Sequence, residues 1–435
     1  MPTDRIFVFV FRRDLRCTDN IGLDRCWAAA KRAGGRIIPI FIFNKRQATA
    51  AANPYYSEKC FEFMLRSLRG LREVLPALSL YEGDDVQVLE SLLTSTRFES
   101  LFYNADFTPF ARARDDRIAV WCGAQGVTCT GVHQEYSLVA PGDMEKPYRK
   151  FTPFYKKYLK TVRLQKAAAA PPRTAFLPGP LRHDLLEVGV KTTPRLLEVG
   201  VKTTPRSEGL AIVRRISKGE FERYEATRDE LFAETTRLSV YLKFGCVGVR
   251  EVFRAVVQAH GVGHALIRQL FWRAFYDQVA YHFPGVLAGQ VTPGKSNESL
   301  NRKYDGIPWV SSQPLFDAWC AGRTGFPIVD AGMRQLLATG YMHNRVRMVS
   351  ANFLVKVLHI DWRLGERFFA QNLVDYDPSS NSGGWQWASG GGADSQQYYR
   401  VFSPWLQAEH HDPGCVYIKR HIPTRSSSRT AAGSR

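Results

Sequence analysis

The sequence lacks paired cysteines. Its eight cysteines are scattered, and neither a Cys-x-x-Cys pair nor a His and Cys spacing typical of zinc ligands occurs. Disulfide-stapled domains and structural zinc sites need such spacings, so both classes are excluded and no metal is expected. Scattered thiols fit a reducing compartment, and we expect the cytoplasm or the nucleus. The cysteines are Cys17, Cys26, Cys60, Cys122, Cys129, Cys246, Cys320 and Cys415.

The sequence also lacks long apolar runs. No uninterrupted apolar stretch is long enough to span a membrane, and there is no long amphipathic basic helix. The first apolar run covers residues 6–11 and is cut off by Arg12 and Arg13, which makes it too short for a secretory signal. We therefore expect neither a membrane association nor secretion.

Acidic residues are scarce relative to basic ones. The chain of 435 residues has 59 Lys and Arg but only 41 Asp and Glu, which gives a net charge of +18. Clustered cations gain affinity for phosphates by displacing counterions, so a polyanionic partner is expected. The length predicts two or three globular domains.

Two nucleotide-binding fingerprints are missing, although the fold that often carries them is predicted. Short apolar, β-favouring runs alternate with helical patterns over residues 1–135, which indicates an α/β domain with a doubly wound parallel sheet. Yet neither G-x-G-x-x-G nor G-x-x-x-x-G-K-[ST] occurs. Such sheets bind ligands beyond the carboxyl ends of their strands, where Arg12, Arg13, Asp14 and Arg16 follow the first strand. The predicted strands are 6–11, 36–43, 78–81, 100–103 and 126–132, and the predicted helices are 20–33, 56–75, 86–95 and 110–124.

Residues 136–206 break this alternation and are predicted to be a linker between domains. A basic and aromatic stretch at 146–157 is followed by a region rich in alanine and proline. Residues 185–195 then recur letter for letter as residues 196–206. A period of that length could suggest a right-handed coiled coil, but the glycine and proline inside each copy exclude a continuous helix. A tandem duplication tolerated in a long exposed loop is the better interpretation, and we assign it no function.

From residue 207 onward the hydrophobic pattern is helical, without convincing strand alternation. Residues 207–423 are therefore predicted to form an all-helical second domain, large enough for one core. The Ser- and Arg-rich tail 424–435 is predicted to be disordered. The predicted helices are 216–233, 248–259, 261–282, 314–321, 328–339, 343–358 and 363–372.

The second domain contains an unusual stretch at residues 375–387. Two aspartates flank a tyrosine, a turn rich in Pro, Ser and Gly follows, and an amide precedes a pair of tryptophans. Glycine lets backbone approach a ligand closely, and carboxylates and amides supply hydrogen-bond partners. An acidic turn before a core-filling Trp pair explains the stretch equally well.

Two further segments are candidates, each with a structural alternative. Residues 235–239 offer three hydroxyls near a helix start, which suits a phosphate, although an ordinary N-cap satisfies the same pattern. Gln269 and Arg273 are i, i+4 neighbours beside Trp272 and Tyr276, but aromatic stripes of this kind are more often core than ligand platform.

Together with other segments, these candidates form an ordered set of motifs that resembles the photolyase/cryptochrome family, closest to class I cyclobutane pyrimidine dimer photolyases. The resemblance runs from about residue 5 to about residue 423 and is interrupted by the duplication. Each motif alone is moderately specific, whereas their order and spacing together are highly specific. The motifs are Val8-Phe-Val-Phe-Arg-Arg-Asp-Leu-Arg16 with Asp19-Asn20, residues 235–239, Gln269-Leu-Phe-Trp-Arg273, Gly325-Phe-Pro-Ile-Val-Asp330, Met333-Arg334, Met342-His-Asn-Arg345, Ile360-Asp-Trp-Arg363 and residues 375–387.

This resemblance implies a U-shaped FAD in the helical domain that acts as a light-driven electron donor. It implies that Asn381 faces the flavin nitrogen that carries the reactive hydrogen, and that Trp385, Trp362 and Trp309 form a hopping chain from the flavin to the surface. The first domain could also hold an antenna chromophore, a folate or a deazaflavin. The residues implied to hold FAD are Tyr224, Thr235, Thr236, Arg237, Leu238, Ser239, Arg273, Asp375, Tyr376, Asp377 and Asn381.

The resemblance implies UV-damaged DNA as the partner of a monomeric enzyme. A flipped pyrimidine dimer needs a basic rim, an aromatic wall and a few hydrogen bonds. The residues implied to line the lesion pocket or contact DNA are Arg228, Gln269, Trp272, Asn344, Arg345, Met348 and Gln407.

The resemblance also bears on which lesion is repaired. Enzymes for (6-4) photoproducts carry two histidines where this chain has Asn344 and Met348, and no nearby His could easily supply the acid which that reaction needs. Three positions depart from the pattern of cyclobutane-dimer enzymes: Gln269 and Ala274 each stand where Glu is common, and Tyr341 where Trp is usual. Light-driven repair of cyclobutane dimers remains the preferred prediction.

Three alternatives stay open. A (6-4) photolyase and a signalling cryptochrome belong to the same family, and Gln269 and the early end of the matched region also allow a catalytically inactive DNA-binding flavoprotein. The tail after residue 423 is too short for a receptor's signalling extension, which favours repair.

Overall fold

The computed structural model of the protein describes residues 5–164, 166–180, 203–291, 294–395 and 399–422. Its first part is a sheet of five parallel strands in the order β3-β2-β1-β4-β5, so the chain winds outward in both directions from β1. The predicted doubly wound parallel sheet is thus confirmed. The strands are β1 (Ile6–Phe11), β2 (Arg36–Phe43), β3 (Ser79–Glu82), β4 (Ser100–Asn104) and β5 (Thr128–Val132).

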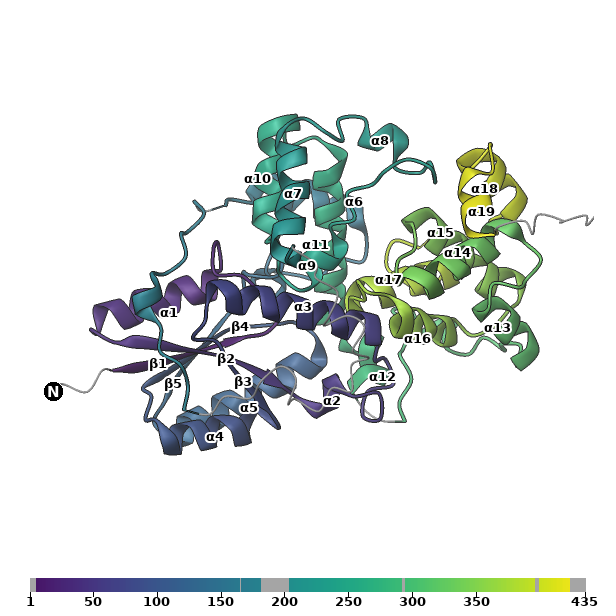
Figure 1. Ribbon diagram of the computed structural model, residues 1–435. Helices are drawn as coiled ribbons and strands as arrows, with labels where there is room; N and C mark the ends of the chain where they lie inside the picture. Colours follow the sequence, from purple (N-terminus) through teal and green to yellow (C-terminus); the bar gives the residue numbers. More distant parts are fainter. Residues whose placement is uncertain (1–4, 165, 181–202, 292–293, 396–398, 423–435) are drawn as a thin grey trace, which may run out of the picture.

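Helices cover both faces of this sheet (Figure 1). α1 (Ile21–Arg32) and α3 (Glu58–Val74) pack on one face, and α4 (Asp85–Ser95) and α5 (Pro109–Ala124) pack on the other. Every residue of β1 is buried, because its alternate side chains enter the two apolar clusters on opposite faces of the sheet.

The segment predicted to be a linker contains ordered elements. α6 (Phe151–Thr161) packs on a long helix of the second part of the chain. α7 (Pro205–Ser217) begins inside the second copy of the duplication, because the side chains and backbone of Thr204 and Ser207 form a reciprocal capping pair. The first copy lies outside the described residues.

The second part of the described chain is helical, as predicted, and its buried apolar residues form two clusters instead of one. One cluster is centred on α10 and α11 and the other on α14 to α17, which correspond to the two helical lobes of Figure 1. α17 joins the lobes because it contacts both α11 and α16. The helices are α8 (Tyr224–Thr227), α9 (Ser239–Lys243), α10 (Val249–His260), α11 (Ala265–His282), α12 (Ala288–Val291), α13 (Gln313–Cys320), α14 (Pro327–Thr339), α15 (Asn344–Asn352), α16 (Trp362–Asn372), α17 (Pro378–Ser389), α18 (Pro404–His411) and α19 (Val416–His421), with α2 (Lys45–Ala48) in the first part.

Two predicted helices are wrong in extent. Residues 216–233 do not form one helix, because α7 ends at Ser217 and the backbone turns left-handed at Gly219 and Phe221 (φ 91° and 70°). Residues 343–358 form α15 and then a π-helical segment. The other predicted helices and strands agree with the structure to within four residues at either end. Seven of the described helices were not predicted: α2, α6, α9, α12, α17, α18 and α19. α7 overlaps the predicted range 216–233 only at its last two residues.

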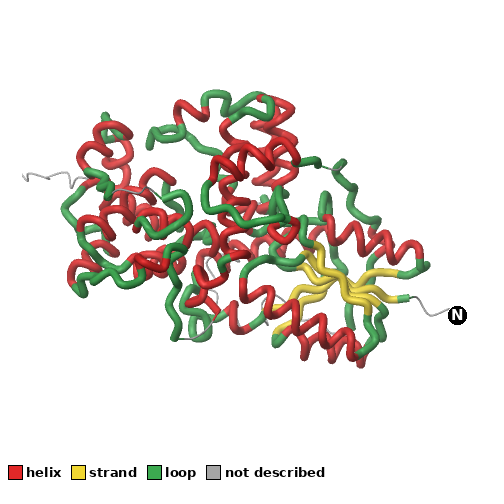
Figure 2. Tube along the Cα trace, turned by 180° about the vertical axis from the view of Figure 1, so that it is seen from behind, coloured by secondary structure: helices red, strands yellow, loops and turns green. Residues whose placement is uncertain are grey.

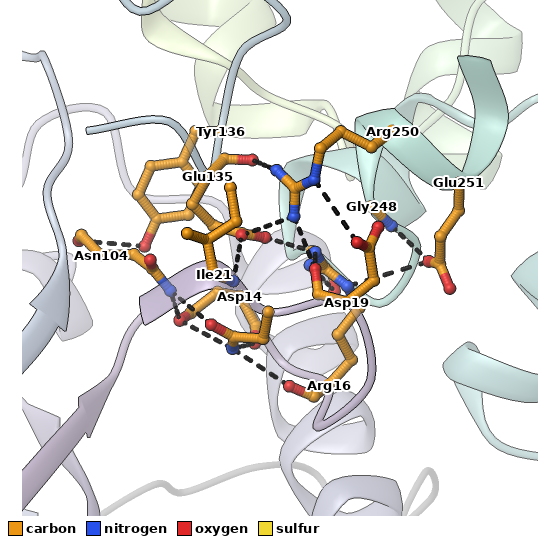
Figure 3. Close-up of polar contacts among 12 residues, drawn as sticks. Asp14, Arg16, Asp19, Ile21, Asn104, Glu135, Tyr136, Gly248, Arg250 and Glu251 are labelled. Carbon is orange, nitrogen blue, oxygen red and sulfur yellow. Dashed lines mark hydrogen bonds and ion pairs between the residues drawn. The ribbon is translucent and has the colours of Figure 1, made fainter. Parts of the chain in front are cut away.

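A buried network of charged side chains joins the sheet to the helical part (Figure 3). Glu135 pairs with Arg16 and, at 2.8 Å, with Arg250 of α10. Arg250 also donates to the backbone carbonyl of Asp19. Buried charges persist when they are paired and hydrogen-bonded, as here. Arg16 therefore belongs to the interface between the two parts, whereas the buried Asp14 accepts hydrogen bonds from Asn20 and Asn104 within the sheet part. Both side chains are engaged in contacts within the protein.

Seen from behind, the sheet lies at one end of the molecule and the helical lobes at the other (Figure 2). Across the described ranges, no helix has the length and apolarity that crossing a membrane would need. Those ranges also contain no group of three or more His, Cys, Asp or Glu that could hold a metal ion.

Candidate functional site

The stretch 375–387 leads into a helix and is not an extended turn. Asp377 caps α17 by accepting a hydrogen bond from the backbone N–H of Ser380 at 3.0 Å, and a proline fills the first helical position, where no N–H is needed. Gly383 faces α11, and a Cβ added to it would lie 2.2 Å from the ring of Tyr276. This glycine allows two helices to pack closely, and its close approach to a ligand stays a prediction.

Asp375 joins three segments that are distant in sequence. Its carboxylate accepts a hydrogen bond from the hydroxyl of Ser239 at 2.6 Å. Arg347 of α15 donates to both carboxylate oxygens at 2.9 and 3.1 Å. The Asp375 side chain is only 2% exposed, so this ion pair is shielded from water and fixes α9, α15 and the start of α17 relative to one another.

Asp377 lies among cations from both parts of the chain. Arg13, which follows β1, donates to its carboxylate at 3.3 Å, and Lys243 and Arg273 also act on it. Burial alone would raise the pKa of this carboxyl, but the cations and the capping N–H outweigh burial and lower the pKa of Asp377 to about 2. Asp377 is therefore ionised at neutral pH.

Asn381 is held by a buried acid. Its amide nitrogen donates to the backbone carbonyl and to Oε1 of Glu366 in α16, each at 3.0 Å. Burial raises the pKa of Glu366 to about 8, although the hydrogen bond from Asn381 and the charge of Arg367 act in the opposite direction. Glu366 is therefore protonated at pH 7, and the pair carries no charge. Among the described residues, Oε2 of Glu366 has no hydrogen-bond partner.

The segment 235–239 surrounds Tyr341. The hydroxyl of Thr235 lies 3.4 Å from that of Tyr341, and the guanidinium of Arg237 lies 5.0 Å from the Tyr341 ring centre. Arg237 has a left-handed backbone (φ 48°), which turns the segment into α9. Leu238 is buried, whereas Thr236 is half-buried.

Two other residues predicted to hold FAD, Arg273 and Tyr224, make their contacts with other segments of the chain. Arg273 donates to the backbone carbonyl of Tyr136 and, through its charge, acts on Asp377. Tyr224, at the start of α8, is half-buried with its ring 6.5 Å from His264, and burial raises the pKa of Tyr224 to about 12.

Tyr376 differs from its two acidic neighbours. Its ring is buried and stacks with Tyr55 at 6.4 Å, on the side of the sheet domain. Burial raises its pKa, and its hydroxyl has no hydrogen-bond partner among the described residues. Tyr376 lines a cavity at the sheet, which is described below.

The three tryptophans of the predicted hopping chain belong to one apolar cluster. Trp385 and Trp362 are buried within it and Trp309 packs against it half-buried. A Cβ added to Gly365 of α16 would lie 2.2 Å from the Trp385 ring, so α16 and α17 are in close contact here. A fourth tryptophan, Trp319, also touches Trp385, with ring centres 6.0 Å apart. Trp319 was not among the tryptophans predicted to form the hopping chain.

Among the predicted DNA contacts, Gln269 and Trp272 lie on α11 and are half-buried. Trp272 stacks face to face on Phe151, the first residue of α6, with ring centres 3.7 Å apart and planes 4° apart. One face of this indole is therefore covered by α6.

The other predicted DNA contacts lie on the second lobe and its edge. On α15, Asn344 is exposed and its amide lies 3.6 Å from the sulfur of Met348. Arg345 pairs with Asp229 at 2.5 Å, which places it beside Arg228. Arg228 follows α8, which contacts α11, so Arg228 lies on the same lobe as Gln269 and Trp272. The pair of Asp229 and Arg345 links this lobe to α15.

Two polar groups near α15 lack partners among the described residues. Gln407 of α18 is half-buried, and its Oε1 is unpaired. His343 caps α15 by accepting from the N–H of Arg345, and its Nε2 is unpaired. Burial lowers the pKa of His343 to about 4, so this histidine is neutral at pH 7.

Comparisons with known proteins identify the family. The family described as DNA photolyase matches residues 7–174, and that described as FAD binding domain of DNA photolyase matches residues 266–432. A protein from Alkalihalophilus pseudofirmus named deoxyribodipyrimidine photo-lyase is 32% identical over 97% of this chain and 88% of its own length. The chain belongs to the DNA photolyase family.

Solved structures of the photolyase family resemble the whole chain. An archaeal photolyase from Sulfolobus tokodaii, with two FAD molecules, has a TM-score of 0.82 and 34% identity, covering 96% of this chain and 90% of that one. A cryptochrome from Synechocystis has a TM-score of 0.81 and 25% identity, covering 97% of this chain and 90% of that one. The predicted fold and the predicted FAD cofactor are confirmed.

The side chains around α17 have the hydrogen-bonding groups that FAD would need. The hydroxyls of Thr235 and Thr236 are donors of the type that phosphates and ribitol need, whereas Ser239 and Arg347 donate to Asp375 and hold the segment in place. Asn381 and Glu366 form a neutral polar surface in the same region, with the unpaired Oε2 of Glu366 still able to hydrogen-bond. A flavin ring is a neutral or singly charged heteroaromatic group, which such a surface can accommodate.

A cavity of about 280 Å³ opens beyond the carboxyl ends of β1 and β2, where the sequence predicted a ligand. Arg12 and Arg13 line it, as predicted, together with Tyr55 and Tyr376. Asn44, at the end of β2, also borders it and donates to a buried aspartate of α4 at 2.6 Å. The cavity combines cations, amides and aromatic walls, which suits a flat heterocycle with anionic groups.

Three further residues near the site around α17 were not predicted from the sequence to belong to it. Arg347 shares a helix face with Asn344, and that spacing could have indicated it. Glu366 is a single acid in an amphipathic helix, and its burial is visible only in the structure. Asp277 is fully buried on α11 with both carboxylate oxygens unpaired among the described residues, and burial raises its pKa to about 8.

Proposed function

We propose that this protein is an FAD-dependent photolyase that splits cyclobutane pyrimidine dimers in UV-damaged DNA under light. The observation that carries the proposal is the neutral pair of Asn381 and Glu366. A photolyase works from fully reduced, anionic flavin, and a neutral amide can hydrogen-bond the ring without adding a negative charge beside it. The name carried by the relative from A. pseudofirmus supports the same activity.

The cofactor would be held by groups on α9, α15 and the start of α17. Residues 235–239, with Tyr224, would contact the phosphates and ribitol, and Arg347 would anchor this region through Asp375. Asp377, held ionised by Arg13 and its other cations, would face the polar adenine side. When bound and reduced, FAD supplies the electron that light mobilises.

Trp385, Trp362 and Trp309 would serve photoreduction. Each is an oxidisable indole in, or packed against, the same apolar cluster, and the half-buried Trp309 would provide the surface end of the path. The apolar surroundings exclude water from Trp385 and Trp362.

The lesion pocket would lie between the two helical lobes. Trp272 and Gln269 would form one wall, and Asn344, Arg345 and Met348 the other, with Arg228 and Gln407 at its edge. Gln269 can donate to a thymine carbonyl but cannot share a proton with it. A (6-4) reaction would need an acid here, and the buried His343 is neutral at pH 7, so this alternative is disfavoured.

The cavity at the end of β1 and β2 would hold an antenna chromophore. Its aromatic walls and the guanidinium groups of Arg12 and Arg13 suit the flat ring and acidic groups of a folate or a deazaflavin. We further propose that the protein acts as a monomer in a compartment that holds DNA.

A comparison of two substrates tests this function. The purified FAD-loaded protein is illuminated with near-UV light in the presence of DNA that carries either cyclobutane dimers or (6-4) photoproducts. Splitting of cyclobutane dimers alone is expected. Repair of (6-4) photoproducts alone would make the protein a (6-4) photolyase. Photoreduction without repair or preference for damaged DNA would identify a cryptochrome-type receptor.

A further inference from the structure

α6 has two chemically opposite faces. Its aromatic residues recur at helical spacing and pack on α11, with Phe154 5.5 Å from Phe275 and Tyr155 5.3 Å from Phe271 between ring centres. The basic stretch noted in the sequence at 146–157 continues along the opposite side. This aromatic face fixes the orientation of α6, and with it the direction in which its lysines point.

The exposed side of α6 and the residues before it carry five exposed cations, which we call the α6 basic face. Lys156 and Lys160 are i, i+4 neighbours on the helix, both exposed, so their charges lie one above the other. The α6 basic face consists of Lys146, Arg149, Lys150, Lys156 and Lys160, all exposed.

Most of this charge is not neutralised within the protein. Two acids lie near the face, and both have partners. Glu145 pairs with the neighbouring Lys157 at 2.9 Å, and Asp394 accepts from the backbone N–H of Phe151 at the start of α6. Among the residues that the structure describes, the side chains of Lys146, Lys156 and Lys160 make no hydrogen bond or ion pair. The helix dipole favours a cation in the last turn by only about 0.3–1 kcal/mol, which accounts for Lys160 but not for Lys156 or Lys146.

Nearby Arg163 is different and is left out of the α6 basic face. Its guanidinium donates to the backbone carbonyls of Lys160 and Val162 at 2.8 and 2.9 Å, so it caps the carboxyl end of α6. Its replacement would weaken the helix as well as remove a charge, which makes it unsuitable for a test.

The helix that carries the α6 basic face borders the proposed lesion pocket through its first residue. Phe151 is the first residue of α6 and stacks on Trp272, and the guanidinium of Arg268 lies 5.7 Å from the centre of the Phe151 ring. α6 lies beside α11 in Figure 1. A duplex placed with a flipped base against Trp272 would therefore lie next to α6, whose exposed side carries the lysines.

We propose that the α6 basic face is a damage-independent binding surface for the phosphate backbone of DNA, adjoining the lesion pocket. This inference rests on the proposed function, because it takes DNA as the partner. Lysines that meet phosphates release counterions and add affinity without reading sequence or damage. Such a surface would hold the enzyme on undamaged DNA while it searches for a lesion.

The test removes two charges that have no structural partner. In the double variant Lys156→Gln and Lys160→Gln, binding to undamaged and to dimer-containing duplex is measured over a range of salt concentrations. Both affinities should fall by the same factor, and the slope of log K against log salt should become less steep by about 1 to 2. The repair rate at saturating DNA and the FAD absorption spectrum should not change.

A matched control variant changes Lys31→Gln and Arg32→Gln, which are exposed cations in the last turn of α1. It removes the same charge and should leave the salt slope unchanged. An unchanged slope in the α6 variant would overturn the inference. A loss of affinity in the α6 variant that is confined to damaged DNA would also overturn it. The same holds if the α6 variant binds DNA normally but no longer binds anionic phospholipid vesicles. The salt slope is measured in the dark and does not depend on repair. A wild type that binds DNA but fails to split dimers would therefore count against the proposed function and not against the α6 basic face.

Discussion

Asn381 of α17 and Glu366 of α16 form a hydrogen-bonded pair in which one amide nitrogen donates twice, to the Glu366 carbonyl and to Oε1, each at 3.0 Å. Burial keeps Glu366 protonated at pH 7, so two polar side chains meet without a net charge. In the proposed site, the acid would hold the amide nitrogen of Asn381 and so orient its oxygen toward a ring proton of the flavin.

Replacing Asn381 by Asp should destabilise the reduced flavin. A carboxylate beside the anionic ring adds like charge, and the donor to Glu366 is lost. The FAD-loaded variant Asn381→Asp should therefore reoxidise faster in air than the wild type, as followed by flavin absorbance. Reoxidation at the wild-type rate would mean that residue 381 does not face the ring.

The charge state of Glu366 should appear in the pH dependence of stability. Its pKa is raised from 4.5 to about 8, so the folded protein holds a proton that the unfolded chain releases between these values. This group therefore lowers the free energy of unfolding as pH rises from 4.5 to 8, by at most about 1.4 kcal/mol per pH unit.

The variant Glu366→Gln keeps a neutral hydrogen-bonding side chain and cannot ionise. The fall in the free energy of unfolding between pH 5 and pH 8, measured with denaturant, should be smaller than in the wild type. Asp277, which also has a raised pKa, is present in both proteins and cancels in this difference. Equal falls in wild type and variant would show that Glu366 is already ionised in the folded protein.

The variant Trp385→Phe should block photoreduction of oxidised FAD and spare repair by enzyme that has been reduced chemically beforehand. Phe is too hard to oxidise to pass on an electron, but it preserves most of the packing in the apolar cluster. Photoreduction is followed by flavin absorbance under blue light. Normal photoreduction in this variant would contradict the hopping assignment.

Trp319 provides the matched control, because it is buried and touches Trp385 but lies off the predicted chain. Trp319→Phe should photoreduce like the wild type, and Trp362→Phe should not. The reverse pattern would route the electrons through Trp319.

Deleting one copy of the duplication should leave the folded core intact. Removal of residues 185–195 or of 196–206 yields the same sequence, in which a Thr-Thr-Pro-Arg segment still precedes α7. The capping pair of Thr204 and Ser207 is then retained, and a shorter loop changes the closure entropy by less than about 1 kcal/mol. Thermal unfolding and FAD content should match the full chain, and a large loss of either would mean that the extra copy is structural.

The sheet domain was predictable because its signals are local. Continuous apolar runs such as residues 6–11 alternate with amphipathic helices. This alternation of short β-favouring runs and helices is typical of the α/β class with a parallel sheet. α17 was missed because residues 378–384 contain a proline, serines and glycines, which have low helix propensity. It forms through the Asp377 cap and close packing on α11 and α16, neither of which is visible locally.

The site was predictable in part for the same reason. Ser239 and Asp375 were both identified, but their contact at 2.6 Å depends on the folded chain. The roles of Glu366 and Trp319 follow from burial beside α17, which a sequence pattern does not record. Arg16 lies in the domain interface, since the end of a strand can serve such an interface as well as a ligand.

The most direct test of the account counts repaired dimers per FAD. Purified FAD-loaded protein, reduced beforehand, is mixed with UV-irradiated oligo(dT) in excess and illuminated with near-UV light, with a dark sample in parallel. We expect many dimers to be split for each flavin in the light and none in the dark. An illuminated sample that binds the damaged oligonucleotide yet leaves its dimers intact would contradict the proposed photolyase activity.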